Sequence, residues 1–339
     1  MNETASPILG SSRAAVETRE FAAQAAAVDV PVLITGETGT GKGVLAAAIH
    51  HGSRRTKRPL VEVNCAGVPD TLFEAEFFGH ARGAFTGAHH ARRGLFEQAS
   101  GGTLFLDEIG ELGLPLQAKL LTSIERGQIR RLGAEATVAV DSRIIAATGV
   151  DLEAAVAAGS FRLDLYHRLL VLSFHLSPLR DRGADIRLLA RHFICTSAAR
   201  HGRRTGDLAP ATLRIIENHP WPGNIRQLAH AMEAAVLNCH GGTILPRDLP
   251  ARLMDATRSA AGPLHSSDSG AGRGRPASRR PGARYSFYGP PAEERQHIEA
   301  ELRACHGNLT RTARALGMSR NTLRARMAAL GIRLPASAR

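Results

Sequence analysis

The sequence predicts an α/β protein in which a parallel sheet carries a phosphate-binding loop, followed by a helical region and a small all-α module. Five continuous apolar runs alternate with helix-type segments, and continuous runs are typical of strands buried on both faces. A glycine-rich loop follows the first run, and helical periodicity returns near the C-terminus after a stretch rich in Gly, Ser, Pro and Arg. The expected strands are residues 32–34, 60–63, 103–106, 143–147 and 171–174.

The 339-residue chain carries its basic excess unevenly. Lys plus Arg total 43 against 31 Asp plus Glu, and residues 251–339 hold 16 arginines against six acidic residues. A basic end on a nearly neutral body predicts a module that binds a polyanion such as DNA. No apolar run approaches the ~18 residues of a membrane-spanning helix, and the four cysteines are too widely spaced for a zinc site. We therefore expect a cytoplasmic protein with reduced thiols and no membrane partner.

An eight-residue glycine-rich segment follows the first expected strand and precedes a helix-forming run at 44–49. Glycines let backbone N–H groups turn toward phosphates, the helix N-terminus adds a positive dipole, and the lysine neutralises phosphate oxygens. The segment therefore predicts an ATP-binding phosphate loop, although no Ser or Thr hydroxyl follows the lysine to bind Mg²⁺. Its residues are Gly36, Glu37, Thr38, Gly39, Thr40, Gly41, Lys42 and Gly43.

Two carboxylates end the strand expected at 103–106. Asp107 and Glu108 lie about 65 residues after the phosphate loop, with one strand between. An acidic pair at a strand end is by itself more often a solvated terminus. In a nucleotide hydrolase, however, Asp107 would hold Mg²⁺ and Glu108 would polarise the attacking water. The combination favours the hydrolase interpretation.

The hexapeptide Gly-Ala-Phe-Thr-Gly-Ala at residues 83–88 resembles the signature loop of AAA+ bacterial enhancer-binding proteins, which activate sigma-54 RNA polymerase. Five further segments resemble that family in the same order, together with the phosphate loop and the acidic pair, so the resemblance covers about residues 7–250. These segments are residues 78–80, 94–99, 161–169, 176–182 and 221–228.

The resemblance implies a mechanical role for the signature loop. Its small, apolar, glycine-flanked tip suggests a partner surface, and in the family the ATP state moves this loop against sigma-54 to remodel closed promoter complexes. The implied partners are the sigma-54 RNA polymerase holoenzyme and further copies of the chain in a homo-oligomeric ring, a hexamer. The residues expected to contact sigma-54 are Gly83, Ala84, Phe85, Thr86, Gly87 and Ala88.

The resemblance also implies roles within the ATP site. Lys42 corresponds to the Walker A lysine, and Asp107 and Glu108 correspond to the Walker B pair. Asn64, at the end of the second strand, corresponds to the Asn that holds the glutamate idle until ATP is sensed. Thr148 corresponds to sensor I. On its own, Asn64 would be interpreted as a cap of the strand end.

Three arginines take their implied roles from the same resemblance. Arg226 corresponds to sensor II and would touch the nucleotide from the lid. Arg162 and Arg168 correspond to residues that enter the neighbouring subunit's ATP site, where a guanidinium stabilises the transferring phosphoryl group. Without the family, both would be interpreted as surface charges on a short helix.

Two positions depart from the family's pattern. The residue directly after the Walker A lysine is Gly43, which provides no hydroxyl for Mg²⁺. Gly149 stands in place of the Asn that follows the sensor I threonine in the family. These departures predict a weakened ATPase and leave open a DNA-binding regulator whose hydrolysis-impaired nucleotide domain serves oligomerisation. A different motor, such as a helicase or clamp loader, is the third alternative, and the intact signature loop argues against it.

Residues 290–336 predict a helix-turn-helix domain. The segments 293–305 and 309–316 have helical periodicity, a turn follows at 317–318, and a third helix begins after Ser319. A basic outer face on such a unit is typical of duplex DNA binding, and the unit resembles a Fis-type domain; a module that serves packing alone is the alternative. The residues expected at enhancer DNA are Ser319, Arg320, Asn321, Thr322 and Arg324.

The sequence thus divides into four expected regions. Residues 1–177 form the AAA+ α/β subdomain that contacts sigma-54, 178–252 the helical lid, 253–289 a flexible linker and 290–336 the DNA-binding domain. We expect no receiver domain before the AAA+ core. Control is therefore expected from a regulatory protein acting in trans, from expression level or from another subunit.

Overall fold

The computed structural model describes residues 8–67, 70–204 and 206–253, and near the C-terminus 295, 298–302, 309–316, 323, 326–327, 330 and 332. The chain divides into two compact units, Met1–Pro263 and Leu264–Arg339, which are treated separately below. In the part of the chain described, no helix has both the length and the apolar character needed to cross a bilayer.

The first unit is built on a five-stranded parallel sheet, which confirms the predicted fold class and all five predicted strands. Its strand order is β2-β5-β8-β1-β9. Each strand pairs in parallel with its neighbours, so the carboxyl ends of all five lie at one edge. The strands are β1 Val32–Thr35, β2 Leu60–Asn64, β5 Thr103–Asp107, β8 Arg143–Thr148 and β9 Leu172–His175.

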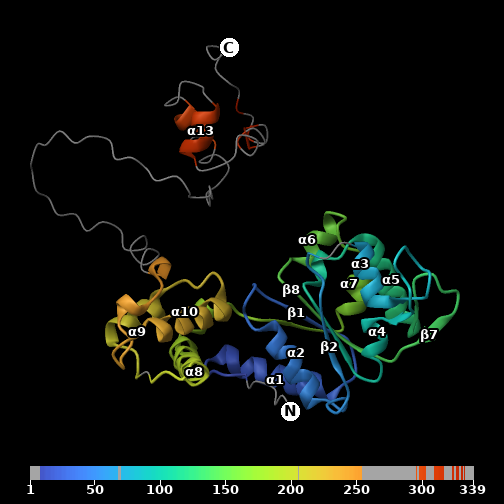
Figure 1. The fold of residues 1–339 in the computed structure, drawn as a ribbon, viewed down its shortest axis with the longest axis horizontal. Coiled ribbons are helices and arrows are strands. Elements are labelled where there is room, and N and C mark those ends of the chain that lie inside the picture. The colour runs from blue at the N-terminus through green and yellow to red at the C-terminus, as the bar shows by residue number, and fades with distance from the viewer. Residues whose placement is uncertain are drawn as a thin grey trace, which may run out of the picture. The chain divides into compact units, whose positions relative to one another are not determined.

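Helices cover both faces of this sheet (Figure 1). Alternate strand residues point to opposite faces, so each face has its own apolar cluster. On one face the strands pack on α1 Arg13–Ala27, which the sequence analysis did not predict, and on α2 Lys42–Gly52. The helices on the other face are α3 Asp70–Phe78, α4 Leu95–Gln98, α5 Leu114–Arg126 and α7 Leu163–Leu169.

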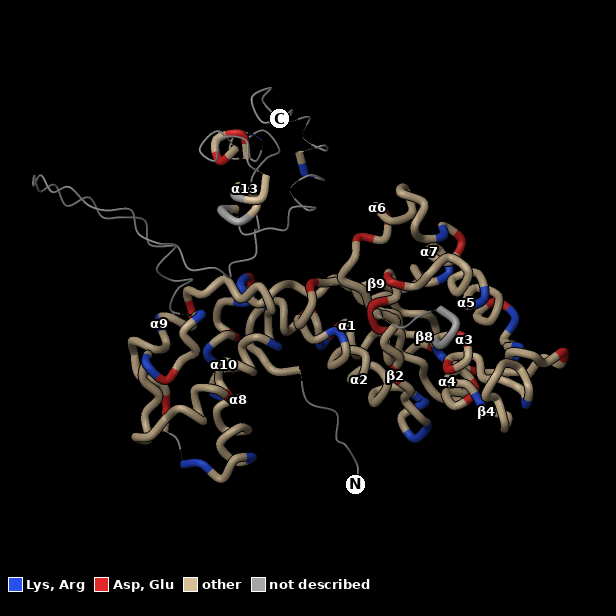
Figure 2. The backbone as a smooth tube through the Cα atoms, turned by 45° about the horizontal axis from the view of Figure 1, so that its top comes forward, with Lys and Arg blue, Asp and Glu red and all other residues tan. Residues whose placement is uncertain are grey.

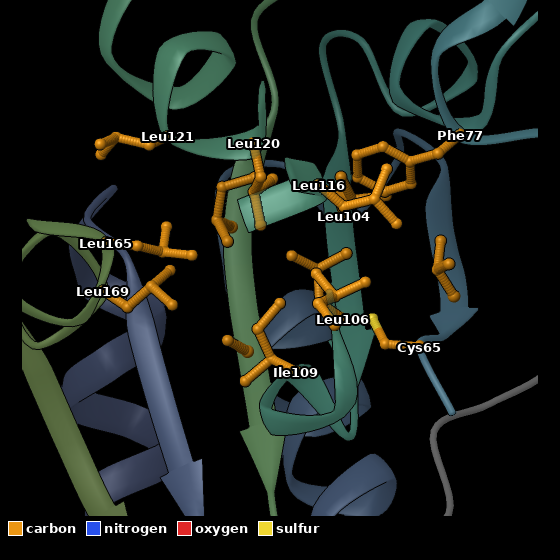
Figure 3. Close-up of a cluster of buried hydrophobic side chains, with 14 of the residues drawn as sticks. Cys65, Phe77, Leu104, Leu106, Ile109, Leu116, Leu120, Leu121, Leu165 and Leu169 are labelled. Carbon is orange, nitrogen blue, oxygen red and sulfur yellow. The ribbon is translucent and has the colours of Figure 1, made fainter. Parts of the chain in front are cut away.

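The larger apolar cluster lies on this second face (Figure 3). Leu104 and Leu106 of β5 are completely buried and pack with Phe77 of α3, Leu120 of α5 and Leu165 of α7. Burying a side chain of this size contributes about 1.5–3 kcal/mol. The cluster therefore anchors β5, whose last residue is Asp107.

Two small antiparallel ribbons, not predicted from the sequence, join this helical layer. β3 Gly79–His80 pairs with β4 Arg92–Arg93, and β6 Gln128–Arg130 pairs with β7 Thr137–Ala139. These strands have only two or three residues each, which is too short for an apolar pattern to be recognised. Helix α6 Leu152–Ala157 and the short 3₁₀ helix η1 Ile109–Glu111 follow β8 and β5, respectively.

The lid is helical, as predicted, and packs around Trp221. This side chain is completely buried, and its indole N–H donates to the carbonyl of Ile216 at 2.8 Å. A buried indole needs such an acceptor, so the turn before the last long helix is held in place. The lid elements are η2 Leu179–Arg182, α8 Ala184–Arg200, α9 Pro210–Asn218, α10 Asn224–Asn238 and η3 Pro246–Asp248.

The second unit is described only in part. Helix α13 Leu309–Ala315 confirms the helix predicted at 309–316. Its Ala313 belongs to an apolar cluster that includes Ile298, Leu302, Leu323 and Met327, all of them buried. The residues expected to bind DNA (319–322 and 324) and the linker from 254 onward lie outside the described residues. The four region boundaries stay predictions.

Candidate active site

The phosphate loop, the acidic pair and the end of β8 meet at the carboxyl edge of the sheet. β1 lies beside β8, and β8 beside β5, so residues far apart in sequence become neighbours there. Helix α2 begins at Lys42, directly after Gly41, which has a left-handed backbone. Its N-terminus therefore faces this edge, where free N–H groups and the helix dipole favour an anion.

Lys42 and Glu108 form an ion pair at the centre of the site. Lys42 is buried, and its Nζ donates to Glu108 Oε1 and to the carbonyl of Gly36, both at 3.1 Å. The other oxygen of Glu108 accepts the backbone N–H of Gly149 at 2.9 Å. The carboxylate proposed to activate water is thus held by the lysine proposed to bind phosphate.

Asp107 has the environment expected of a cation ligand. Burial first, and then the like charge of Glu108, raises the pKa of its carboxyl, whereas Lys42 opposes that shift. A divalent cation would relieve both effects, and Mg²⁺ commonly binds through one or two carboxylates plus substrate phosphates. No group of three or more ligating side chains occurs within the described segments. Asp107 therefore fits Mg²⁺ brought with a nucleotide rather than a protein-only metal centre.

Backbone strain is concentrated beside this site. Glu108, Trp221 and Asn224 have φ angles of 55°, 47° and 50°, and no other non-glycine residue described has a positive φ. Left-handed backbone costs free energy in residues with a side chain and persists where the surroundings fix it. At Glu108 it turns the chain directly after β5.

The lid docks onto the phosphate loop through backbone hydrogen bonds. The N–H groups of Ile225 and Arg226 donate to the carbonyl of Gly39 at 2.9 and 3.3 Å. Gly39 has φ +81°, and a Cβ there would lie 2.4 Å from the carbonyl oxygen of Gly223, so only glycine fits. The structure brings the backbone of Arg226 to the loop, and its exposed side chain lines the same cleft as Lys42, Asp107 and Glu108.

The contacts that Glu37 makes with the lid were not predicted from the sequence. Its carboxylate accepts two hydrogen bonds from Arg180 and one from Asn224. Hydrogen bonds from Arg180 first, and from Asn224 second, lower the pKa of Glu37 to about 2. The resemblance had marked both lid segments, but no spacing in the sequence could connect them with Glu37.

An apolar pocket of about 120 Å³ adjoins the phosphate cleft and shares Gly41, Val44, Phe193 and Ile225 with it. Because it is apolar and continues from the end of the phosphate loop, it has the chemistry to hold a planar base. The sequence analysis missed it, although two apolar residues at the start of the described chain contribute. Its other lining residues are Ile8, Leu9, Thr18, Thr40, Leu45, Leu176, Arg182, Leu189 and His192.

Asn64 lies at the end of β2, beside Asp107 of β5, but its side chain bonds locally. Its side-chain oxygen accepts the N–H of Ala66 at 2.9 Å, which closes a local turn after β2. In the described residues no hydrogen bond joins Asn64 to Glu108, whose two carboxylate oxygens accept from Lys42 and Gly149 instead. This arrangement differs from the expected one, and a switching role for Asn64 stays a prediction.

The threonines of the site use their hydroxyls locally. Thr148 is completely buried at the end of β8 and accepts the N–H of Val150 at 3.0 Å. Thr40 is buried and donates to the carbonyl of Glu37 at 2.8 Å, whereas Thr38 is exposed at the cleft. Gly43 also lines the cleft and offers no hydroxyl.

Arg162 and Arg168 lie outside the chain's own cleft. Both are exposed at the ends of α7, and neither lines the cleft that contains Lys42. Arg162 forms a two-pronged ion pair with Asp164 at 2.7 and 3.0 Å. Its backbone N–H donates to Gln117 at 2.8 Å, which fixes the start of the helix. Both side chains are therefore exposed away from the chain's own cleft, and the guanidinium of Arg162 is paired with Asp164.

The Gly83–Ala88 loop projects between β3 and β4. The N–H of Gly83 donates to the carbonyl of Ala88 at 2.8 Å, which closes the loop base. Phe85 at its tip is 46% exposed, as predicted, but its ring packs against His80 with centroids 5.0 Å apart. Ala88 is buried and Thr86 is exposed. The loop therefore presents an apolar and hydroxyl-bearing tip on a fixed base.

The β6–β7 hairpin braces this loop. Leu132 exchanges backbone hydrogen bonds with Gly79 and Ala81 at 2.9 Å, so the hairpin lies beside β3. Arg131 next to it forms a two-pronged ion pair with the nearly buried Glu97 of α4. The hairpin then leads through residues 140–142 into β8, whose end meets the phosphate loop. The segment that braces the signature loop is thus directly connected in sequence to the strand that ends at the phosphate site.

Comparison with known protein families agrees with this geometry. Residues 8–175 match the sigma-54 interaction domain, 180–265 the AAA+ ATPase lid domain, and 290–330 the Fis family of bacterial regulatory proteins. The chain is 42% identical over 325 residues to the regulatory protein AtoC of Escherichia coli, covering 96% of this chain and 68% of AtoC. It is 43% identical to the sigma54-dependent transcriptional activator SfnR of Pseudomonas putida, covering 91% and 84%, respectively.

Solved structures give the same result. NtrX from Brucella abortus in complex with ATP superposes with a TM-score of 0.68 at 29% identity, over 96% of this chain and 69% of NtrX. The chain spans 63% of the nitric oxide reductase regulator NorR of Aeromonas hydrophila, at 42% identity. The chain therefore belongs to the sigma-54-dependent bacterial transcriptional regulators, with a sigma-54 interaction domain, an AAA+ lid and a Fis-family module in that order.

Proposed function

We propose that this chain hydrolyses ATP and uses the Gly83–Ala88 loop to remodel sigma-54 RNA polymerase closed complexes while its last domain binds enhancer DNA. The observation that carries the ATPase proposal is the contact of Lys42 with Glu108 beside Asp107, at the N-terminus of α2. An ATP-bound solved relative supports nucleotide binding.

The residues divide the reaction between them. The phosphate-loop N–H groups and Lys42 would bind the β- and γ-phosphates, and the apolar pocket would hold the base. Asp107 would hold Mg²⁺, which when bound would neutralise phosphate charge. Once Lys42 engages phosphate, Glu108 becomes free to accept a proton from the attacking water. Arg162 and Arg168 of a neighbouring copy would complete the site in a ring, a hexamer, located in the cytoplasm.

The further assignments belong to this proposal as well. Thr148 would act as sensor I and Arg226 as sensor II, and Asn64 would engage Glu108 in another nucleotide state. The DNA contacts come from residues 319–322 and 324, and a regulatory protein acts in trans. The boundaries at 177, 252 and 289 separate core, lid, linker and DNA-binding domain.

We also propose that Gly43 and Gly149 slow the hydrolysis. A Cβ at Gly149 would lie 3.6 Å from the carbonyl oxygen of Gly36 and 3.7 Å from Glu108 Oε2 and Thr38 Oγ1, which are ordinary contact distances. We therefore expect Gly149→Asn to raise turnover. The hydrolysis-impaired alternative has less support because Lys42, Asp107 and Glu108 are assembled. ATPase activity measured against protein concentration tests the proposal: no turnover at any concentration would contradict it.

A further inference from the structure

The carboxylate of Glu37 joins the phosphate loop to two separate segments of the lid. Arg180 donates from Nη2 to Oε1 at 2.6 Å and from Nη1 to Oε2 at 3.0 Å. Asn224 donates from Nδ2 to Oε2 at 3.1 Å. Arg180 lies in η2, where the lid begins, and Asn224 is the first residue of α10, which carries Arg226. One side chain of the loop therefore holds both the entry to the lid and its nucleotide-facing helix.

Both polar atoms of the Asn224 side chain form hydrogen bonds, which hold the residue in place. Its Nδ2 also donates to the carbonyl of Thr38 at 3.1 Å, and its Oδ1 accepts the N–H of Leu179 at 2.8 Å. The residue is completely buried, and its left-handed backbone is held by these contacts. Residues 37–39 of the loop and the start of α10 therefore cannot shift independently without breaking hydrogen bonds of the buried Asn224 side chain.

Electrostatics explain why Arg180 accompanies Glu37. An ionised carboxylate inside a phosphate loop repels the phosphates that the loop binds. The low pKa of Glu37, about 2, keeps it ionised at neutral pH, and Arg180 supplies the compensating charge. Figure 2 shows acidic and basic positions interspersed over core and lid. The Glu37–Arg180 ion pair differs from an ordinary surface pair because it joins the core to the lid at the phosphate loop.

The pair contributes little to folding stability. The side chains of Arg180 and Glu37 are 45% and 42% exposed, and ion pairs this accessible are largely screened by water. Loss of the pair should therefore leave the fold intact. Its geometry, two-pronged and shared with the buried Asn224, suits the relative placement of loop and lid instead.

We propose that Glu37, Arg180 and Asn224 form a latch that transmits nucleotide binding at the phosphate loop to helix α10. These are positioning residues that act through Arg226, and the proposal rests on the ATPase function proposed above. When phosphates order the loop, the latch moves α10 with it and keeps Arg226, which lines the cleft, against the bound nucleotide. Without the latch the loop still binds nucleotide, but only the backbone bonds from Ile225 and Arg226 to Gly39 link it to α10, so the lid follows the loop less closely.

The first test is a double-mutant cycle of Glu37→Gln, Arg180→Gln and the double variant. Each single variant should lower kcat for ATP about tenfold through misplacement of Arg226, and should change ADP affinity less than about threefold. The kcat of the double variant should be no lower than that of either single variant, because all three variants lose the same interaction between residues 37 and 180. Additive losses, or losses confined to ADP affinity, would overturn the latch.

Arg13→Gln provides the matched control. It removes a surface ion pair of similar length, 2.7 Å to Glu17 on α1, away from the cleft. The control should retain kcat, and all variants should melt within about 2 °C of the unmodified chain. A large fall in melting temperature for Glu37→Gln alone would show that the pair is structural and would also overturn the latch.

The second test does not need hydrolysis. ADP should slow hydrogen exchange of the backbone amides of residues 226–232 in the unmodified chain, and much less in Glu37→Gln, although both bind ADP. Equal protection in the two chains contradicts the latch and leaves the ATPase proposal standing. Differential protection in a chain that hydrolyses no ATP supports the latch and contradicts the ATPase proposal.

Discussion

The Nζ of Lys42 lies 3.1 Å from the carboxylate of Glu108, and the N–H of Gly149 holds the other oxygen of that carboxylate at 2.9 Å. These residues follow three neighbouring strands of the sheet, so the contact depends on the strand order β5-β8-β1. The same lysine is the group best placed to bind phosphate. Binding phosphate and holding the glutamate are therefore alternatives at a single ammonium group, so phosphate binding would release Glu108.

Glu108→Gln should bind ATP but hydrolyse it 10²–10⁴-fold more slowly, since an amide cannot accept a proton from water. Nucleotide affinity should be retained because Lys42 loses a competing anion. Filter binding and phosphate release measure the two effects. Glu111→Gln, an exposed position in the adjoining η1, is the control and should hydrolyse normally. Full turnover by Glu108→Gln would remove this residue from the mechanism.

Hydrolysis should rise more than linearly with protein concentration, because Arg162 lies outside the cleft of its own chain. Arg162→Ala should lose about 10³-fold in rate and keep nucleotide affinity. Mixing this variant with Glu108→Gln should restore activity, because roughly a quarter of the interfaces in a mixed ring have both residues intact. Arg54→Ala, exposed near the opposite edge of the sheet, should behave as unmodified protein. Turnover strictly linear down to nanomolar protein would exclude a shared site.

Thr86→Ala should hydrolyse ATP normally but fail to form open complexes at a sigma-54 promoter. Thr86 is exposed at the loop tip and belongs to no part of the phosphate cleft, so it acts through contact. ATPase assays and permanganate footprinting of the promoter distinguish the two steps. Activation at the unmodified rate would show that the loop serves structure alone in this chain.

Folding stability should fall on mild acidification because of His50. This imidazole is buried and bonded to Thr103 at 2.9 Å, and burial first, with help from His51 and Arg143, lowers its pKa. The unfolded chain takes up a proton near pH 6.5 and the folded chain does so only at lower pH. Stability is therefore complete above pH 6.5 and declines below it, by at most about 1.4 kcal/mol per pH unit for this group.

Urea unfolding at pH 8 and pH 5.5 measures this effect. His50→Gln should lose about 1 kcal/mol at pH 8, as is usual for a buried substitution, and should show a smaller acid loss. The dependence of folding stability on pH should not disappear in this variant, because burial also lowers the pKa of His219 in the lid. His89→Gln, exposed beside the signature loop, should show the unmodified pH dependence. An unchanged slope in His50→Gln would show that His50 is not the responsible group.

DNA binding by residues 290–336 should weaken steeply with salt, each phosphate contact contributing about −0.9 to the log–log slope. Arg324→Ala should weaken binding to all sequences and flatten the slope by about one. Arg320→Ala should cost roughly 1–3 kcal/mol on the enhancer site and little on random DNA. Fluorescence anisotropy over a salt series measures both.

Deletion of residues 290–339 provides the complementary test of the same module. The truncated chain should lose enhancer binding and keep its ATPase activity, because the proposed motor lies entirely upstream. A truncated chain with full, salt-sensitive and site-specific affinity would show that the AAA+ body binds DNA.

The sequence by itself was sufficient to predict the elements that are determined by residues close together in the chain. Continuous apolar runs predicted all five strands, and glycine spacing with a following helix predicted the phosphate loop. The two- and three-residue strands β3, β4, β6 and β7 are too short to show periodicity, and their pairing depends on neighbouring segments. Only the tertiary structure could decide which partners the functional side chains take. Glu37 meets Arg180 across 143 positions, and Glu108 meets Lys42 and Gly149 rather than Asn64. Such contacts depend on strand order, on left-handed turns and on how the lid closes over the sheet, all of which are set by packing between segments distant in sequence.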